Sequence, residues 1–156
     1  MWGGEMRRKA MMAGVLAAIL AIGGCAFNNP SKADVTSVED SLVTMPAGWT
    51  LLWVDGDNSS SEGFQKDLAI GAAHEGSIGA DHLGALLRAI IEAVPPGARY
   101  YIHISVDEMP DGGSATNIRI PASELKLYDN GVGGAFDHGE IYATRAQLKA
   151  ALEASP

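Results

Sequence analysis

The feature that most constrains this chain is a short apolar run that ends at its only cysteine. Three basic residues at positions 7–9 precede the uncharged run Ala10–Ile22, and two glycines lead into Cys25. A cationic cap, a short apolar segment and a small-residue exit are the parts of a secretory signal. The run is too short to cross about 30 Å of hydrocarbon as a helix. We therefore expect residues 1–24 to be a signal peptide and the folded domain to follow it.

Residues 22–25, Ile-Gly-Gly-Cys, closely resemble the lipobox of bacterial lipoproteins. The resemblance implies that a lipid is attached to the thiol of Cys25, that a peptidase cuts just before it, and that the new amino terminus is acylated with a fatty acid such as palmitate. Two or more acyl chains give stable anchoring where one is marginal. Ala26 rather than Asp at the next position implies the outer membrane, with the domain facing the periplasm. The resemblance covers only the first 25 residues. An ordinary cleaved signal or an uncleaved anchor is the alternative.

The cysteine count and the charge limit what the remaining 132 residues do. With Cys25 lipidated, the domain has neither a disulfide nor a thiol nucleophile and must be held together by packing alone. Three of the eleven basic residues and one of the nineteen acidic residues leave with the signal, so the formal charge becomes −10. Such a charge repels nucleic acid. It also repels anionic headgroups, so we expect the lipid rather than the protein to contact the membrane.

The first half of the mature chain is predicted to contain a tether, a strand and a helix. Residues 25–46 are polar and favour a flexible tether, with a short helix over 35–43, ahead of a globular domain over 47–156. Trp49–Asp55 is apolar on both alternating faces, which is typical of a central strand. Trp49 and Trp53 would then share one face, either in the core or, if exposed, as an aromatic platform. We expect a loop over 56–61 and a helix over 62–74.

The second half shows clearer periodicity. Apolar residues recur at three- and four-residue steps over 81–94, which predicts a helix that starts near Asp81 and stops at a Pro-Pro-Gly sequence. Residues 99–106 alternate as a strand. Short strands are expected over 116–120, 125–127 and 140–143, with a loop over 129–139. Thr144 and Gln147 form a capping box for a last helix. These elements predict a single α+β domain, with a mainly antiparallel sheet of four or five strands packed against two or three helices.

Two acidic loops are candidate cation sites. Asp55, Asp57 and Glu62 supply the oxygen ligands that Ca²⁺ prefers. Lys66 stands where the twelfth-position carboxylate belongs, however, and turn chemistry explains the segment more simply. The glycine-rich loop that contains Asp129, Asp137 and His138 echoes a calcium loop only in part, because glycines replace oxygen donors. A surface loop whose glycines let a partner approach is the preferred interpretation, so these three residues are candidate binding residues.

A second group surrounds the turn at residues 76–80 and is the candidate catalytic set. It does not fit the zinc-protease spacing, because Ile78 occupies the position of the second histidine. It does not fit the nucleophile elbow either, because Glu75 replaces a glycine. Polar helix ends are an adequate explanation for these residues. The set consists of His74, Glu75, Ser77, Asp81 and His82.

The strand over 99–106 carries the remaining candidate site. Arg99, Tyr101, His103 and Ser105 share the face opposite the apolar residues. If that face is open, it is a surface for a ligand or partner with a group that titrates near neutral pH. If a helix covers it, His103 is a hydrogen-bonded core residue. Both interpretations stay open at this stage.

No complete catalytic constellation and no cofactor fingerprint is found in the sequence, and no cofactor is predicted. The preferred hypothesis is a non-enzymatic, lipid-anchored module that binds an envelope or secreted protein. Acidic domains associate quickly with basic partners, which fits an assembly component, an inhibitor or a toxin-neutralising protein. The alternative is a small hydrolase or metal-dependent envelope enzyme built on the residues around 74–82. A small-ligand carrier, which requires a sizeable apolar cavity, is a third class.

Overall fold

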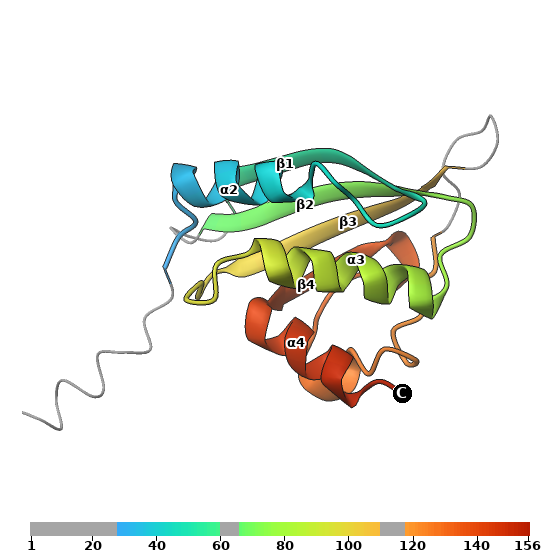
Figure 1. Ribbon diagram of the computed structural model, residues 1–156. Helices are drawn as coiled ribbons and strands as arrows, with labels where there is room; N and C mark the ends of the chain where they lie inside the picture. The colour runs from blue at the N-terminus through green and yellow to red at the C-terminus, as the bar shows by residue number, and fades with distance from the viewer. Residues whose placement is uncertain (1–27, 60–65, 110–117) are drawn as a thin grey trace, which may run out of the picture.

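The computed structural model describes residues 28–59, 66–109 and 118–156 of the chain. Its elements follow the order α2 (Lys32–Leu42), β1 (Trp49–Ser59), β2 (Lys66–Glu75), α3 (Ala80–Ala93), β3 (Tyr101–Met109), β4 (Glu140–Thr144) and α4 (Arg145–Ala154), with the 3-10 turns η2 (Tyr128–Asn130) and η3 (Phe136–His138) before β4. The strands form one sheet in the order β1-β2-β3-β4. The predicted α+β class is confirmed, with four strands and three α-helices in these ranges (Figure 1).

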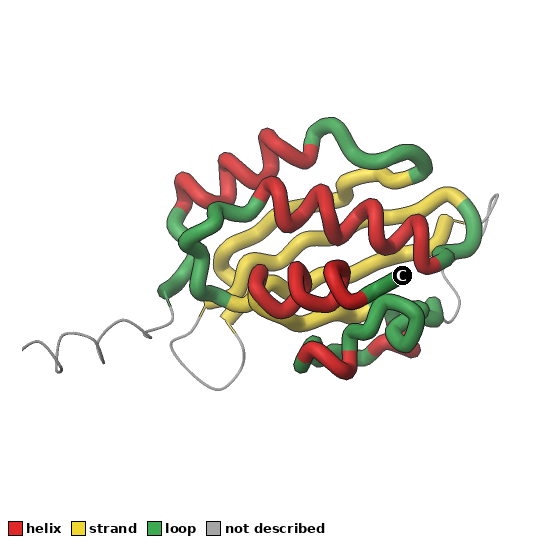
Figure 2. Tube along the Cα trace, turned by 60° about the horizontal axis from the view of Figure 1, so that its bottom comes forward, coloured by secondary structure: helices red, strands yellow, loops and turns green. Residues whose placement is uncertain are grey.

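The fold has two layers, with the helices on one face of the sheet (Figure 2). β1 and β4 run antiparallel to their neighbours, whereas β2 and β3 are parallel. A parallel pair needs a long crossover connection, and α3 supplies it across the sheet. The core lies between the layers and is made mainly of the apolar stripe of α3 and the inward residues of β2, β3 and β4. Among the described residues, no helix is long and apolar enough to cross a bilayer.

β2 lies where the sequence predicted a helix over 62–74, and that prediction is wrong. The spacing of Leu68 and Ala72 fits a helical stripe, but it fits alternate positions of a strand equally well. Residues 67–74 are all buried, and β1 and β3 pair with the two edges of β2. β2 is therefore a central strand. Trp49–Asp55, which was predicted to be central, belongs to the edge strand β1.

A β-bulge separates the two tryptophans that were expected to share a face. Leu51 pairs with Ala72 and Trp53 pairs with Gly71, so Leu52 is an extra residue between them. An extra residue shifts the side-chain alternation by one position. Trp49 is 6% exposed on the helix side, whereas Trp53 is 42% exposed on the opposite side. β1 also continues to Ser59, so residues 56–59 of the loop predicted over 56–61 belong to a strand.

The periodic elements of the second half are confirmed. α3 covers the predicted amphipathic helix, with Asp81 in its first turn. β3 alternates between buried and partly exposed residues, as predicted for 99–106. At α4 the predicted capping box is present, because Thr144 Oγ1 accepts from the Gln147 amide at 3.3 Å and Gln147 Oε1 accepts from the Thr144 amide at 2.8 Å.

The strands predicted near 118–120 and 125–127 do not form. Ile118, Ile120, Leu125 and Leu127 are buried, as their apolar character requires, but they lie in turns and irregular segments. The Ile120 amide donates to the carbonyl of Phe136 at 2.8 Å, and the Leu127 amide donates to Ala122 at 2.9 Å. These bonds are made within the segment 118–139 rather than along a neighbouring strand. Residue 116 lies outside the described residues.

The amino-terminal segment from Asn28 belongs to the domain, so residues 28–46 are not part of a flexible tether, as was predicted for 25–46. Ser31 caps α2, with its hydroxyl accepting from the Asp34 amide at 3.0 Å. Val38 and Leu42 of α2 are fully buried in the core. The helix predicted over 35–43 is confirmed and extends one turn further toward the amino terminus. The apolar face of α2 holds the segment on the sheet.

Candidate interaction surface

The side chains that point away from the helices form the second face of the sheet, which we call the open face. No helix of the described ranges lies over it (Figures 1 and 2). The register of the strands identifies its members. They are Thr50, Trp53 and Asp55 from β1; Asp67, Ala69, Gly71, Ala73 and Glu75 from β2; Tyr101, His103, Ser105, Asp107 and Met109 from β3; and Glu140, Tyr142 and Thr144 from β4.

Aromatic rings occupy both sides of the open face. The rings of Tyr101 and Tyr142 stack with their centroids 4.6 Å apart and an interplanar angle of 10°. On the other side, the indole of Trp53 lies across β2 at Gly71, where a Cβ would overlap the ring. Glycine at this position is therefore what allows the indole to lie flat on the sheet. The partly exposed rings offer flat apolar surfaces of the kind found at protein interfaces.

A polar network joins β3 and β4 between these rings. The carboxylate of Glu140 contacts Nε2 of His103 with one oxygen and accepts from the Ser105 hydroxyl at 3.1 Å with the other. The side chains of His103 and Glu140 are 36% and 33% exposed, so the network is accessible to solvent. The Ser105 hydroxyl is directed at Glu140 and not at His103. A nucleophile activated by a base requires a hydroxyl-to-imidazole contact, so these three residues do not form that arrangement.

Asp67 is a buried carboxylate at the edge of this network. Only 5% of the residue is exposed. The Tyr142 hydroxyl donates a hydrogen bond to the carboxylate, while Oδ1 has no hydrogen-bond partner among the described residues. Burial raises the pKa of Asp67 above its usual value, and the Tyr142 hydrogen bond and the nearby His103 oppose that rise. Burial, together with the adjacent negative charge of Asp67, raises the pKa of Tyr142 to about 12.

The charge of the open face is one-sided. Asp55, Asp67, Glu75, Asp107 and Glu140 contribute carboxyl groups, and among the described side chains of this face there is no lysine or arginine. His103 is the basic residue of the face, and Glu140 is its partner. A surface with this balance attracts cationic groups, and partly exposed tyrosine and tryptophan rings also bind lysine and arginine through their π faces.

Of the candidate catalytic residues, the structure brings together the two histidines and leaves the other three exposed. His74 is buried on the helix side, where its ring stacks on His82 at 4.4 Å and lies 4.9 Å from Trp49. His74 Nδ1 contacts the carbonyl of Gly76 at 3.1 Å, and His82 Nδ1 lies 3.2 Å from the carbonyl of Ser77. The imidazoles therefore contact the backbone of the turn. The side chains of Glu75, Ser77 and Asp81 are exposed around it.

The candidate cation sites receive no support from the geometry. Asp55 is an exposed residue of β1, Asp57 lies in the same strand and Glu62 falls outside the described residues. No group of three or more potential metal ligands is found in the described part of the chain.

The remaining candidate binding residues are separated from the open face. Asp129 lies in η2, whereas Asp137 and His138 lie in η3. The segment that carries them contacts the outer edge of β4 through a bridge between Gly133 and Tyr142. Arg99 precedes β3, and its amide donates to the side chain of Asn28 at 2.8 Å. Of the predicted binding residues, Tyr101 and His103 therefore lie together on the open face.

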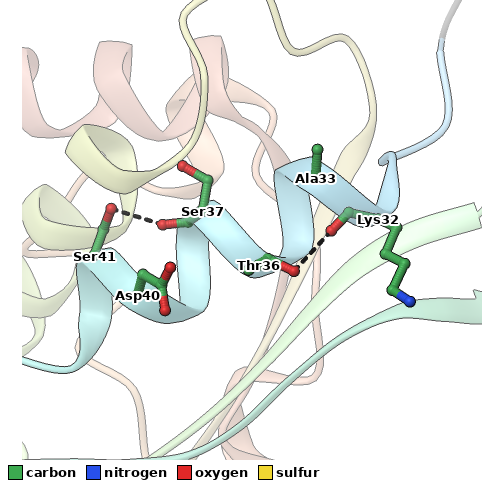
Figure 3. A pocket seen from close by; sticks show the side chains of 6 residues that line it. All are labelled: Lys32, Ala33, Thr36, Ser37, Asp40 and Ser41. Carbon is green, nitrogen blue, oxygen red and sulfur yellow. Dashed lines mark hydrogen bonds between the residues drawn. The ribbon is translucent and has the colours of Figure 1, made fainter.

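The hollow on α2 does not resemble a ligand cavity. A hollow of about 660 Å³ lies on α2 and is lined by Lys32, Ala33, Thr36, Ser37, Asp40 and Ser41. Figure 3 shows that these side chains all come from one helix. The hydroxyls of Thr36 and Ser41 donate to carbonyls of the same helix at 3.1 and 2.7 Å. This hollow lacks the several converging elements that a small-molecule site has.

Sequence reasoning missed Asp67, Tyr142 and Glu140 as members of the surface. Asp67 was placed in a helix, which hid its position beside β3. The signal for the other two was present, because Glu140, Tyr142 and Thr144 alternate with two apolar residues as one strand face. No family model matches this chain, and no curated protein and no solved structure matches it either.

Proposed function

We propose that this chain is a lipid-anchored envelope protein whose domain binds a basic partner protein through the open face of the sheet. The observation that carries the proposal is a sheet face without a covering helix that combines aromatic rings with carboxylates and has no lysine or arginine among its described side chains. Aromatic residues are enriched in the centres of protein interfaces. Complementary charge speeds association and selects the partner.

The anchor is supported by the amino-terminal sequence. The cationic cap, the short apolar run and the residues 22–25 are those of a lipoprotein signal, which makes Cys25 the lipid-bearing residue. Lipid attachment would place the domain at a membrane, facing the periplasm if the residue after the cysteine directs it to the outer membrane. The partner classes that fit are a basic component of an envelope assembly, a basic secreted toxin or a cell-wall enzyme. The hydrolase alternative has no comparable support, because its candidate residues point to the backbone or to solvent.

A charge-reversal experiment tests the docking surface. Asp107→Lys changes the charge of the open face, and Glu92→Lys makes the same change on the exposed side of α3. Each variant and the unchanged protein are used to capture partners from an envelope extract at low salt. We expect the captured partner to fall at least tenfold for Asp107→Lys and to stay within twofold for Glu92→Lys. The capture should also weaken as salt is raised, because exposed charges are screened.

Equal capture by the two variants would contradict the assignment to the open face. Absence of any reproducible partner at low salt would contradict the binding function. Incorporation of labelled palmitate, and its loss in Cys25→Ser, tests the anchor separately.

A further inference from the structure

A second hollow lies in the irregular segment 118–139, which borders the outer edge of β4. It measures about 570 Å³ and is lined by residues of two stretches, 119–128 and 134–137. Small-molecule sites in proteins are concave and measure about 300–1,000 Å³. This hollow is within that range, and it forms where two stretches meet, whereas the hollow on α2 is made by a single helix.

The two stretches are joined at the base of the hollow. The Ile120 amide donates to the carbonyl of Phe136 at 2.8 Å, and both side chains are buried. Tyr128 packs edge-on against Phe136, with the ring centroids 4.9 Å apart and an interplanar angle of 86°. Gly134 has a φ of 142°, and a Cβ there would overlap the carbonyl of Glu140, so the backbone requires glycine. The hollow is therefore built into the fold.

The residues that line the hollow include polar ones whose side chains the fold does not use. Arg119, Ser123 and Glu124 are exposed, and their side chains make no hydrogen bond or ion pair among the described residues. Asp137 is also exposed, and its carboxylate lies 3.7 Å from the imidazole of His138. A guanidinium only donates, a carboxylate only accepts and a hydroxyl does both. The hollow therefore offers donors and acceptors to a ligand.

Tyr128 adds an exposed aromatic ring to this lining. The residue is 65% exposed, and its edge contact with Phe136 orients the ring. A tyrosine is apolar on its ring faces and polar at its hydroxyl. A sugar ring has a matching pattern, with a face of C–H groups and a rim of hydroxyls. A purely apolar ligand would instead leave the charged groups without partners.

We propose that this hollow binds a saccharide, with the C–H face of a sugar ring against Tyr128. The sugar hydroxyls donate to the carboxylates of Glu124 and Asp137 and accept from the guanidinium of Arg119. Hydrogen bonds of this kind, with one charged partner, are stronger than those between neutral groups. The site is separate from the open face, so it goes beyond the proposed binding of a partner protein and does not depend on it.

Saturation-transfer difference NMR with tri-N-acetylchitotriose tests the site. This trisaccharide is neutral, and its sugar unit also occurs in bacterial cell walls. With the full chain purified in detergent, we expect saturation of the C–H protons of the sugar rings. Tyr128→Ala should reduce the signal at least fivefold, whereas Tyr128→Phe, which keeps the ring, should stay within twofold. Glu124→Gln removes a charged acceptor from an exposed position and should reduce the signal at least threefold.

Two matched controls locate the binding on the molecule. Trp53→Ala removes an exposed ring from the open face, and Glu39→Gln removes an exposed carboxylate from α2. Both should keep the signal within twofold of the unchanged protein. A second arm adds purified, insoluble cell-wall glycan. If the glycan displaces the trisaccharide, the ligand is the polymer, and if it does not, the ligand is a free oligosaccharide.

Three results would overturn the proposal. The first is the absence of a trisaccharide signal from the unchanged protein. The second is an undiminished signal in both Tyr128→Ala and Glu124→Gln, or a loss in Trp53→Ala instead, which would place the sugar elsewhere. The third is saturation of arginine amide without saturation of the trisaccharide, which would show that the acidic groups of the hollow take a cation. Because Glu124 is exposed and outside the packed base, its variant remains informative even if Tyr128→Ala is unstable.

Discussion

The two faces of the sheet differ in almost every physical property, although they are built from alternate residues of the same strands. The covered face presents Leu68, Ile70, Ile102, Ile104 and Ile141, all fully buried under the helices. The open face carries carboxyl groups, a histidine and three aromatic rings. The covered face supplies hydrophobic burial and therefore most of the stability. The open face contributes less to folding and offers the groups that recognise another molecule.

The composition of the open face explains why no helix of the described residues covers it. Burying a neutral polar group without a hydrogen bond in an apolar environment costs about 2–7 kcal/mol. Burying a carboxylate without a paired charge costs more. Asp67 shows this cost within the sheet, because burial disfavours the charged form of its carboxyl group and so raises its pKa. Additional burial of Glu140 or Asp107 under an apolar helix would add the same kind of cost. A cationic partner offsets it.

The largest predicted difference between the faces appears at two neighbouring residues of β3. Ile104→Ala removes a fully buried side chain on the covered face and should lower the free energy of unfolding by about 2–5 kcal/mol. Ser105→Ala removes one hydrogen bond to Glu140 on the open face and should cost no more than about 1 kcal/mol. Urea denaturation of both variants measures the contrast. Similar losses for the two would show that the open face is part of the folding core.

The contact between Gly71 and Trp53 gives an intermediate effect. Gly71→Ala forces the indole off the strand and should cost about 1–3 kcal/mol, with a change in tryptophan emission. Trp53→Ala in the same background removes the overlap. The double variant should therefore be less destabilised than the sum of the two single variants. Additive losses would mean that the indole does not rest on Gly71.

Asp67→Asn tests the buried carboxyl group through the pH dependence of stability. The pKa of Asp67 is higher in the folded state than its usual value of 3.8, so the folded state favours the protonated carboxyl group. Its stabilising contribution to the free energy of unfolding is complete below pH 3.8 and is lost as the pH rises through the higher pKa of the folded state. Asparagine does not titrate, so the variant should be more stable than the wild type at pH 7, by up to about 1 kcal/mol. The difference should shrink toward pH 3. A variant that is less stable at pH 7 would show that the charge is well accommodated.

The smallest effect is expected at the exposed pair of β3 and β4. Glu140→Gln keeps the shape of the side chain and removes its charge next to His103. A pair that is one-third exposed contributes about 0–1 kcal/mol to the free energy of unfolding, and salt weakens this contribution further. Thermal unfolding at low and high ionic strength checks this value. A loss well above 1 kcal/mol that persists at high salt would place the pair in the core rather than on a recognition surface.

The elements with strong periodicity were predictable from sequence, whereas the identity of the central strand was not. The stripe of α3 and the alternation of β3 follow from one apolar face each. β2 is made central by long-range pairing with β1 and β3, and a run of small and apolar residues such as Leu68–Ala73 fits a helix as well as a strand. The bulge at Leu52 was also hidden, because nothing in the local sequence marks the extra residue that separates Trp49 from Trp53.

The candidate site was predictable only along a single strand. Tyr101 and His103 follow from the alternation of β3, but the uncovered state of that face depends on where the helices pack. Asp67 and Tyr142 join the site because β2 and β4 lie on either side of β3, and strand order is not encoded in a local pattern. The fixed position of Asn28 and Asn29 has the same origin, since their partners are more than thirty residues away along the chain.

Photo-crosslinking in living cells tests the recognition role of the open face most directly. A photoreactive residue at position 105 lies on the open face, and one at position 88 lies on the exposed side of α3. We predict a discrete crosslinked species of higher mass from position 105 and none of comparable yield from position 88. A crosslinked species from position 88 with none from position 105 would contradict the claim that the partner binds the open face.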